Sequence, residues 1–218
     1  MLEIGSLTKS FGAVKALEDI SLKIDTGEMV AVIGRSGAGK STLLRCINML
    51  ETPTSGTIQC NDQYVSTLKG KRLNEWRELY KLGMKDQALQ RAGTLSGGQQ
   101  QRVAISRAMM QEPEILLADE PVASLDPRNT HAVMSTLSEI NTERGITVLV
   151  NLHSIEIAKQ YCDRVIGLRD GHLVFDAPVN ALTDSALETI YDGADIEEAL
   201  APIPGTGEFD PSQMGSAA

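Results

Sequence analysis

The chain has few aromatic residues, few cysteines and no long apolar run. Aromatic residues make up 4% of its 218 residues, and its three cysteines, Cys46, Cys60 and Cys162, lie far apart. An odd number of cysteines without the spacing of metal ligands predicts reduced, partly buried thiols rather than a disulfide. No apolar run approaches the roughly 18 residues of a membrane span, and residues 1–5 lack the basic start and apolar core of a signal peptide. We therefore expect a globular protein that stays in the cytosol.

The chain also lacks an excess of basic charge. Its net charge is −9, and no Lys or Arg follows Arg169. Binding to duplex phosphates requires a basic stripe, which this sequence does not have, so nucleic acid is not an expected partner. We expect residues 192–218 to form an acidic tail without fixed structure. The acids of this segment are Asp192, Asp195, Glu197, Glu198, Glu208 and Asp210.

A glycine-rich segment between an apolar run, Val30–Ile33, and a helical pattern has the composition of a phosphate-binding loop. Its glycines allow backbone N–H groups to gather around a polyphosphate at a helix N-terminus. We expect Lys40 to reach the β- and γ-phosphates and Ser41 to ligate Mg²⁺. The alternative is a glycine-rich turn that merely precedes a helix. The residues of the segment are Gly34, Arg35, Ser36, Gly37, Ala38, Gly39, Lys40, Ser41 and Thr42.

Two further apolar runs end in polar residues of catalytic type. Asp119 and Glu120 follow Ile115–Ala118, as in a buried parallel strand whose carboxyl end opens into a site. With the phosphate loop in the same chain, we expect Asp119 to hold Mg²⁺ and Glu120 to act as general base, rather than both being turn acids. His153 follows residues 146–150 and is a candidate to contact the γ-phosphate or orient water, although a structural histidine is the alternative.

Two other segments are candidates for nucleotide contacts, and a third is a loop that carries an acid. Phe11, expected in a turn, offers a flat face for an adenine ring or fills a local core. Ser96 and Gln99 have capping-box spacing around Gly97 and Gly98, which predicts a helix start that approaches a phosphate, or a well-capped surface helix. Asp126 lies in the loop of residues 123–127.

In this order, the motifs resemble those of one family, the ATP-binding subunits of ABC transporters. The resemblance implies a P-loop NTPase of α/β class, with a mainly parallel sheet, an antiparallel β appendage and a helical subdomain, over residues 1–191. It implies a head-to-tail homodimer that encloses ATP and Mg²⁺. Ser96–Gln99 of one copy would then cap the γ-phosphate held by Lys40 and Ser41 of the other. Phe11 matches the adenine-stacking aromatic, and Asp126 matches a loop at the dimer interface.

Within the family, residues 150–153, 119–127 and 165–171 are most similar to the ATPase of phosphonate importers. The resemblance implies membrane permease subunits, a solute-binding protein and a peripheral place on the cytoplasmic face of the cell membrane. A single short cassette argues against a soluble ABC ATPase of translation or repair.

The interval from Lys40 to Ser96 is shorter than the family requires. Residues 61–98 resemble a shortened helical subdomain without the glutamine loop, and Gln87 is not taken for the missing glutamine. A deletion, a degenerate paralogue and a segment missing from the sequence are the possible causes, and we favour a real shortening. We hypothesise that the chain binds ATP·Mg²⁺ but hydrolyses it poorly. The alternative function is a nucleotide-binding module uncoupled from transport.

Overall fold

A computed structural model describes residues 1–61, 63–65, 97–109, 113–192, 196 and 199–200. In this part of the chain the strands form two sheets. The smaller sheet is antiparallel and has the order β2-β1-β4-β5. Its strands are β1 (Leu2–Phe11), β2 (Val14–Ile24), β4 (Ser55–Cys60) and β5 (Gln63–Tyr64).

The hairpin of β1 and β2 consists of two long strands whose pairing is irregular. Its strands are 10 and 11 residues long, and their pairing shifts register between Ile4 and Leu7 and again before Ser10. Irregular pairing of this kind lets two long strands stay together across polar residues that interrupt the apolar alternation. Phe11, expected in a turn, is the last residue of β1 and pairs with Val14.

The larger sheet has the order β6-β7-β3-β8-β9. Its first four strands are parallel, and only the last runs antiparallel to its neighbour, so the predicted mainly parallel sheet is confirmed. The carboxyl ends of parallel strands lie at one edge of a sheet, and ligands bind at that edge. The strands are β3 (Met29–Ile33), β6 (Ile115–Ala118), β7 (Thr147–Asn151), β8 (Arg164–Arg169) and β9 (His172–Pro178).

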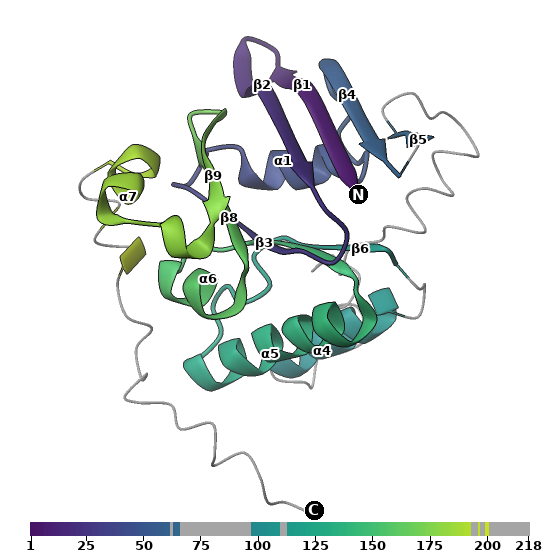
Figure 1. The fold of residues 1–218 in the computed structure, drawn as a ribbon, viewed down its shortest axis with the longest axis vertical. Helices are drawn as coiled ribbons and strands as arrows, with labels where there is room; N and C mark the ends of the chain where they lie inside the picture. The colour runs from purple at the N-terminus through teal and green to yellow at the C-terminus, as the bar shows by residue number, and fades with distance from the viewer. Residues whose placement is uncertain (62, 66–96, 110–112, 193–195, 197–198, 201–218) are drawn as a thin grey trace, which may run out of the picture.

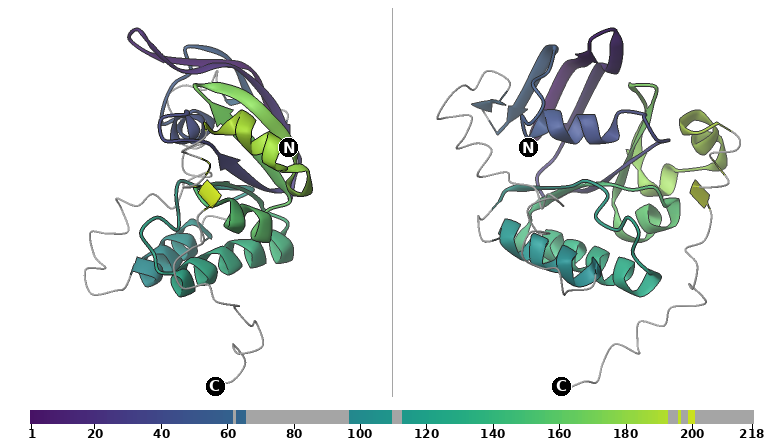
Figure 2. Two further views of the ribbon diagram at one scale, coloured as in Figure 1. Left: turned by 90° about the vertical axis from the view of Figure 1, so that its left-hand side faces the viewer. Right: turned by 180° about the vertical axis from the view of Figure 1, so that it is seen from behind.

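Helices cover the larger sheet on both faces. Figure 1 shows α1 (Lys40–Ile47) between the two sheets, with α4 (Gly97–Met109), α5 (Pro127–Arg144) and α6 (Ile155–Tyr161) beyond the larger sheet. The views in Figure 2 show the same layers, and α7 (Asp184–Ile190) lies beside the β8–β9 hairpin after a 3-10 turn, η2 (Val179–Ala181). This arrangement produces a separate core on each face of the sheet.

Strand β3 is shared by the two cores, because its side chains alternate between the faces of the sheet. Val30 and Val32 belong to the core that contains α1 and the small sheet. Met29, Ala31 and Ile33 belong to the core that contains α5 and α6. All five residues are buried, which explains why the run is apolar without alternation.

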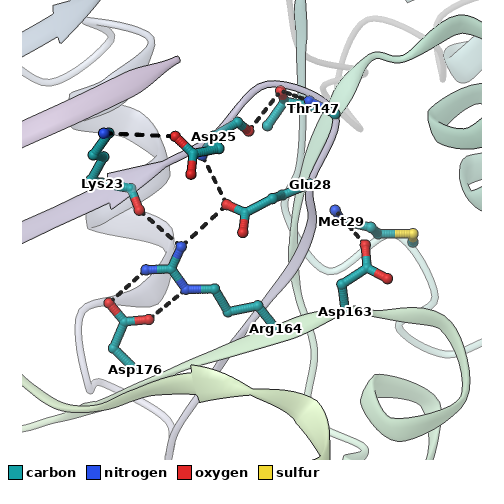
Figure 3. A network of polar contacts seen from close by, with 9 residues as sticks. Lys23, Asp25, Glu28, Met29, Thr147, Asp163, Arg164 and Asp176 are labelled. Carbon is teal, nitrogen blue, oxygen red and sulfur yellow. Dashed lines mark hydrogen bonds and ion pairs between the residues drawn. The ribbon is translucent and has the colours of Figure 1, made fainter.

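Arg164 joins the two sheets through the polar network in Figure 3. Its guanidinium donates to both carboxylate oxygens of Asp176 on β9, at 2.6 and 2.8 Å. It also donates to the main-chain oxygen of Lys23 on β2, at 2.9 Å, and to Glu28 just before β3, at 3.2 Å. A planar guanidinium has five N–H donors, enough for these four contacts, whereas an ammonium has only three. The network therefore fixes β2 against the strand that leads into the phosphate loop.

Several sequence predictions fall outside the described residues. Ser96, the position of the missing glutamine loop and nearly all of the shortened helical subdomain belong to this group, as does most of the predicted acidic tail. The three cysteines are described, and each is buried and free of disulfides. The prediction of reduced thiols is consistent with this, although the side chains are more completely buried than expected.

Candidate nucleotide-binding site

The phosphate loop connects the end of β3 to the start of α1, and two of its glycines are required by close main-chain contacts. At Gly34, with φ of 143°, an added Cβ would lie 2.2 Å from the main-chain oxygen of Leu168 on β8. At Gly39, with φ of 103°, it would lie 2.5 Å from the main-chain oxygen of Ala16 on β2. The loop is therefore held between one strand from each sheet, and only glycine fits at these two positions.

Lys40 is the first residue of α1 and is only 5% exposed. Its ammonium donates to the main-chain oxygens of Gly34, at 2.7 Å, and Arg35, at 3.0 Å. Burial lowers the pKa of Lys40, and the negative charges of Glu120 and Asp119 oppose that shift. Because an ammonium has three donors, one N–H is left for a ligand after the two main-chain bonds.

Ser41, Asp119 and Asn151 meet where β6 and β7 end beside α1. The Ser41 hydroxyl donates to Oδ1 of Asp119 at 2.8 Å, and the Asn151 amide donates to the same oxygen at 2.7 Å. Asn151 is fully buried, and its own Oδ1 has no hydrogen-bond partner among the described residues. Asn151 was missed by the sequence reasoning, although a polar residue at the end of an apolar strand is a usable signal.

Ser41 and Asp119 form a pair of oxygen donors that fits Mg²⁺. Among the described residues, no group of three His, Cys, Asp or Glu side chains gathers as a metal cage. Mg²⁺ does not need one, because it is commonly bound by one or two protein oxygens together with water and substrate phosphates.

Glu120 and His153 follow the same two strand ends and contact each other. His153 Nε2 and Glu120 Oε1 share a hydrogen bond of 3.0 Å. Their side chains are 55% and 40% exposed, so both are accessible to a bound ligand. Glu120 has a positive φ of 51°, a conformation that is uncommon for a residue other than glycine and is often found at functional sites.

Comparison with known proteins agrees with this geometry. The ABC transporter family model matches residues 17–79 and 68–123. The chain is 41% identical to the phosphonates import ATP-binding protein PhnC of Rhizobium johnstonii, over 92% of this chain and 91% of that protein. It is 44% identical to PhnC of Bradyrhizobium diazoefficiens, over 88% of this chain and 90% of that protein. The chain belongs to the ATP-binding subunits of ABC transporters.

Solved ABC cassettes have the same fold. A dimeric structure of the cassette MJ0796 in a post-hydrolysis state, bound to ADP and Pi, is 29% identical, with a TM-score of 0.71 over 82% of this chain and 99% of that one. The predicted fold class is thereby confirmed. No helix in the described part of this ABC cassette is long and apolar enough to cross a membrane.

The comparisons also bear on the shortening of this ABC cassette. The alignment to the Rhizobium PhnC spans 254 positions but holds 92% of 218 residues, so about 50 positions of the alignment have no residue of this chain. The family model matches in two parts that meet at residues 68–79. This is within the region in which the sequence analysis placed the missing segment.

The structure also describes Phe11, Asp126 and the start of α4, which were predicted to contact nucleotide. The Phe11 ring is 48% exposed, and Nζ of Lys9 lies 4.6 Å from its centroid. Asp126 is the N-cap of α5 and accepts from the Asn129 amide at 3.0 Å. Gly97 starts α4, while Gly98 and Gln99 are described only as part of that helix. The nucleotide-binding roles of these residues remain predictions.

Arg35 has a different environment from the one expected. Its guanidinium forms an ion pair of 2.9 Å with Asp192, which also pairs with Arg169. Asp192 was assigned to the acidic tail, yet its side chain is held against the phosphate loop. Asp192 therefore has a defined position, whereas the boundary of the acidic tail remains a prediction.

Proposed function

We propose that this chain is the ATP-binding and ATP-hydrolysing subunit of an importer whose solute is a phosphonate or a related oxyanion. The observation that carries the proposal is the convergence of Lys40, the Ser41–Asp119 pair and the Glu120–His153 pair at one edge of the larger sheet. The PhnC relatives support the solute class, because they match over about nine tenths of the chain.

The phosphate loop supplies the binding energy for the triphosphate. Its N–H groups at the start of α1 and the remaining N–H of Lys40 are directed to negative oxygen atoms. Ser41 and Asp119 would hold Mg²⁺, which neutralises charge on the phosphates. Asn151 keeps the Asp119 carboxylate oriented toward Ser41. Phosphoryl transfer in such sites depends mainly on positioning and on stabilisation of charge.

Glu120 is the proposed general base for the attacking water. His153 donates a ring N–H to Glu120, which fixes the orientation of the carboxylate and leaves its other oxygen free to accept a proton. In this proposal, His153 also contacts the γ-phosphate. Both side chains reach solvent, as a pair that works on a bound water requires.

We also propose that two copies assemble head to tail around ATP. The solved cassette MJ0796 is dimeric, which supports the assembly of two copies. In this assembly, the Ser96–Gln99 segment of one copy would complete the phosphate site of the other. Gly97 packs so closely on Leu125 that an added Cβ would lie 2.8 Å from its Cδ2. In the proposed dimer, the start of α4 and the loop before Asp126 would lie at the interface together, because Gly97 and Leu125 are in contact. Permease subunits at the cytoplasmic face of the membrane, together with a solute-binding protein, complete the proposed importer.

ATP turnover of the Glu120→Gln variant tests the proposed ATPase activity. Glu139→Gln, on the exposed face of α5, is the matched control. Loss of a general base lowers turnover by about 10²–10⁴-fold and leaves the phosphate contacts intact, so MgATP binding should persist. Glu139→Gln should leave both unchanged. Undiminished turnover in Glu120→Gln would contradict the proposed mechanism.

The shortening favours a second candidate, a nucleotide-binding module with weak turnover. About 50 positions of the PhnC alignment have no residue of this chain, and we infer that they belong to the shortened helical subdomain. We predict MgATP binding with turnover below that of a full-length relative measured in parallel. Equal turnover would remove this candidate. Import is then tested in a host whose own phosphonate-import ATPase gene has been deleted, grown on an alkylphosphonate as sole phosphorus source. This chain should restore growth. If growth is not restored although ATP turnover is normal, the transport role is refuted.

A further inference from the structure

The segment that follows α7 is fixed to the larger sheet beside the phosphate loop. Helix α7 begins at a Thr183 cap and buries Leu187 and Ile190. Gly167 on β8 permits this docking, because an added Cβ there would lie 2.6 Å from Cγ1 of Ile190. The helix ends where the Tyr191 N–H donates to the main-chain oxygen of Leu187 at 2.7 Å. Tyr191 and Asp192 therefore have defined positions.

Tyr191 reaches the first residue of the phosphate loop. Its hydroxyl accepts a hydrogen bond from the main-chain N–H of Gly34 at 3.2 Å, and its side chain is buried. Gly34 is the residue that passes against the main-chain oxygen of Leu168. The start of the loop thus lies between β8 on one side and the Tyr191 hydroxyl on the other.

Asp192 adds a second attachment at the next position of the loop. One carboxylate oxygen pairs with Arg35 at 2.9 Å, and the other pairs with Arg169, at the end of β8, at 2.5 Å. Arg169 also donates to the main-chain oxygen of Thr189 at 3.1 Å. The carboxylate therefore bridges the loop to the strand end and to the last turn of α7.

We propose that Tyr191 and Asp192 are positioning residues that hold the phosphate loop in its nucleotide-binding conformation. This inference rests on the proposed ATPase function. Each contacts the loop through one residue, Tyr191 through Gly34 and Asp192 through Arg35. In this account, Arg35 serves to anchor the loop rather than to contact nucleotide as the sequence suggested.

If the phosphate loop loses these attachments, MgATP binding should weaken more than the rate of ATP hydrolysis. If the free loop keeps its binding conformation only a tenth of the time, the apparent Kd for MgATP rises about tenfold, because binding must first select that conformation. Once nucleotide is bound, the phosphates hold the loop, so kcat at saturation should change by less than about twofold.

The two residues should differ in effect. The Tyr191 bond is buried, and its loss leaves a buried N–H of Gly34 without this acceptor. Asp192 and Arg35 are 51% and 40% exposed, so their ion pair is screened by solvent and salt. We expect Asp192→Asn to raise Kd by about two- to threefold, less so at high salt, and Asp192→Glu to restore most of the affinity.

The experiment measures Kd for MgATP by calorimetry, and KM and kcat by phosphate release, in Tyr191→Phe. Tyr161→Phe is the matched control, because the Tyr161 hydroxyl also makes a hydrogen bond, of 2.9 Å, to His131 on α5 and has no contact with the phosphate loop. Tyr191→Phe should raise Kd and KM about tenfold with kcat nearly unchanged. Tyr161→Phe should leave all three unchanged.

Unchanged Kd and KM in Tyr191→Phe, or an equal rise in Tyr161→Phe, would overturn the positioning role. If Tyr191→Phe does not fold, Asp192→Asn and its rescue by Asp192→Glu decide the matter, and failure of both effects overturns the proposal. Lys40→Ala distinguishes failure of the positioning role from failure of the proposed ATPase function. If Lys40→Ala binds MgATP as tightly as the unaltered chain, the proposed ATPase site itself is wrong.

Discussion

Two glycines of the phosphate loop, Gly37 and Gly39, differ in how closely the surrounding residues pack against them. Gly37 and Gly39 both have positive φ, 81° and 103°. An alanine at either position incurs the cost of a left-handed backbone, about 1–2 kcal/mol. Their surroundings differ. An added Cβ at Gly37 meets nothing within 4 Å, whereas at Gly39 it lies 2.5 Å from the main-chain oxygen of Ala16 and 2.8 Å from Cδ2 of Leu17.

The difference in surroundings sets the expected difference in stability. The Leu17 side chain can shift, but the Ala16 oxygen belongs to the backbone of β2 and cannot move alone. Overpacking of this kind costs typically about 1–3 kcal/mol. We therefore expect Gly37→Ala to destabilise the free protein by about 1–2 kcal/mol and Gly39→Ala by about 2–5 kcal/mol.

Urea unfolding without nucleotide measures both values. The midpoint should fall further in Gly39→Ala than in Gly37→Ala, with similar slopes, and far-UV circular dichroism follows the transition. Nucleotide is left out so that the midpoints report the stability of the free protein and not a change in ligand binding. If the two variants lose equal stability, or if Gly37→Ala loses more, the close packing of Gly39 against β2 is wrong.

Three further predictions follow from the same site and its supports. Asn151→Ala removes a donor to Asp119, so the Mg²⁺ concentration for half-maximal ATP turnover should rise about tenfold or more, and an unchanged Mg²⁺ titration would contradict this. Burial raises the pKa of Cys46 to about 11 and that of Cys162 to about 12, so a thiol reagent at pH 8 should label them only after denaturation. Hydrogen bonds from the residues that follow lower the pKa of Asp126 below its ordinary 3.8. The difference in free energy of unfolding between the unaltered chain and Asp126→Ala should be complete above pH 3.8. It should disappear as the pH falls through the lower pKa that Asp126 has in the folded protein. A difference that does not depend on pH would argue against the cap.

Local motifs carried most of what could be predicted from the sequence. The phosphate loop lies between a strand and a helix, and both follow from nearby residues, as do the apolar runs that end at Asp119 and His153. The structure places Ser41 beside Asp119 and Glu120 beside His153, although the catalytic roles of these residues remain predictions.

Contacts between distant residues could not be predicted in this way. Tyr191 and Gly34 are 157 residues apart, and no periodicity or spacing connects them. Asn151 was given no role from the sequence, because its partner Asp119 lies 32 residues earlier on another strand. The register shifts between β1 and β2 could not be predicted either, since they depend on cross-strand pairing rather than on the pattern of either strand alone.

The Arg164 network limits how this cassette can be recombined with its relatives. Lys23 and Glu28 come from the N-terminal portion, whereas Arg164 and Asp176 come from the C-terminal portion. A chimera that exchanges the first 28 residues must therefore supply its own acceptors for the same guanidinium. Grafts joined without regard to that match should separate into two unfolding transitions, whereas matched grafts should melt as one unit.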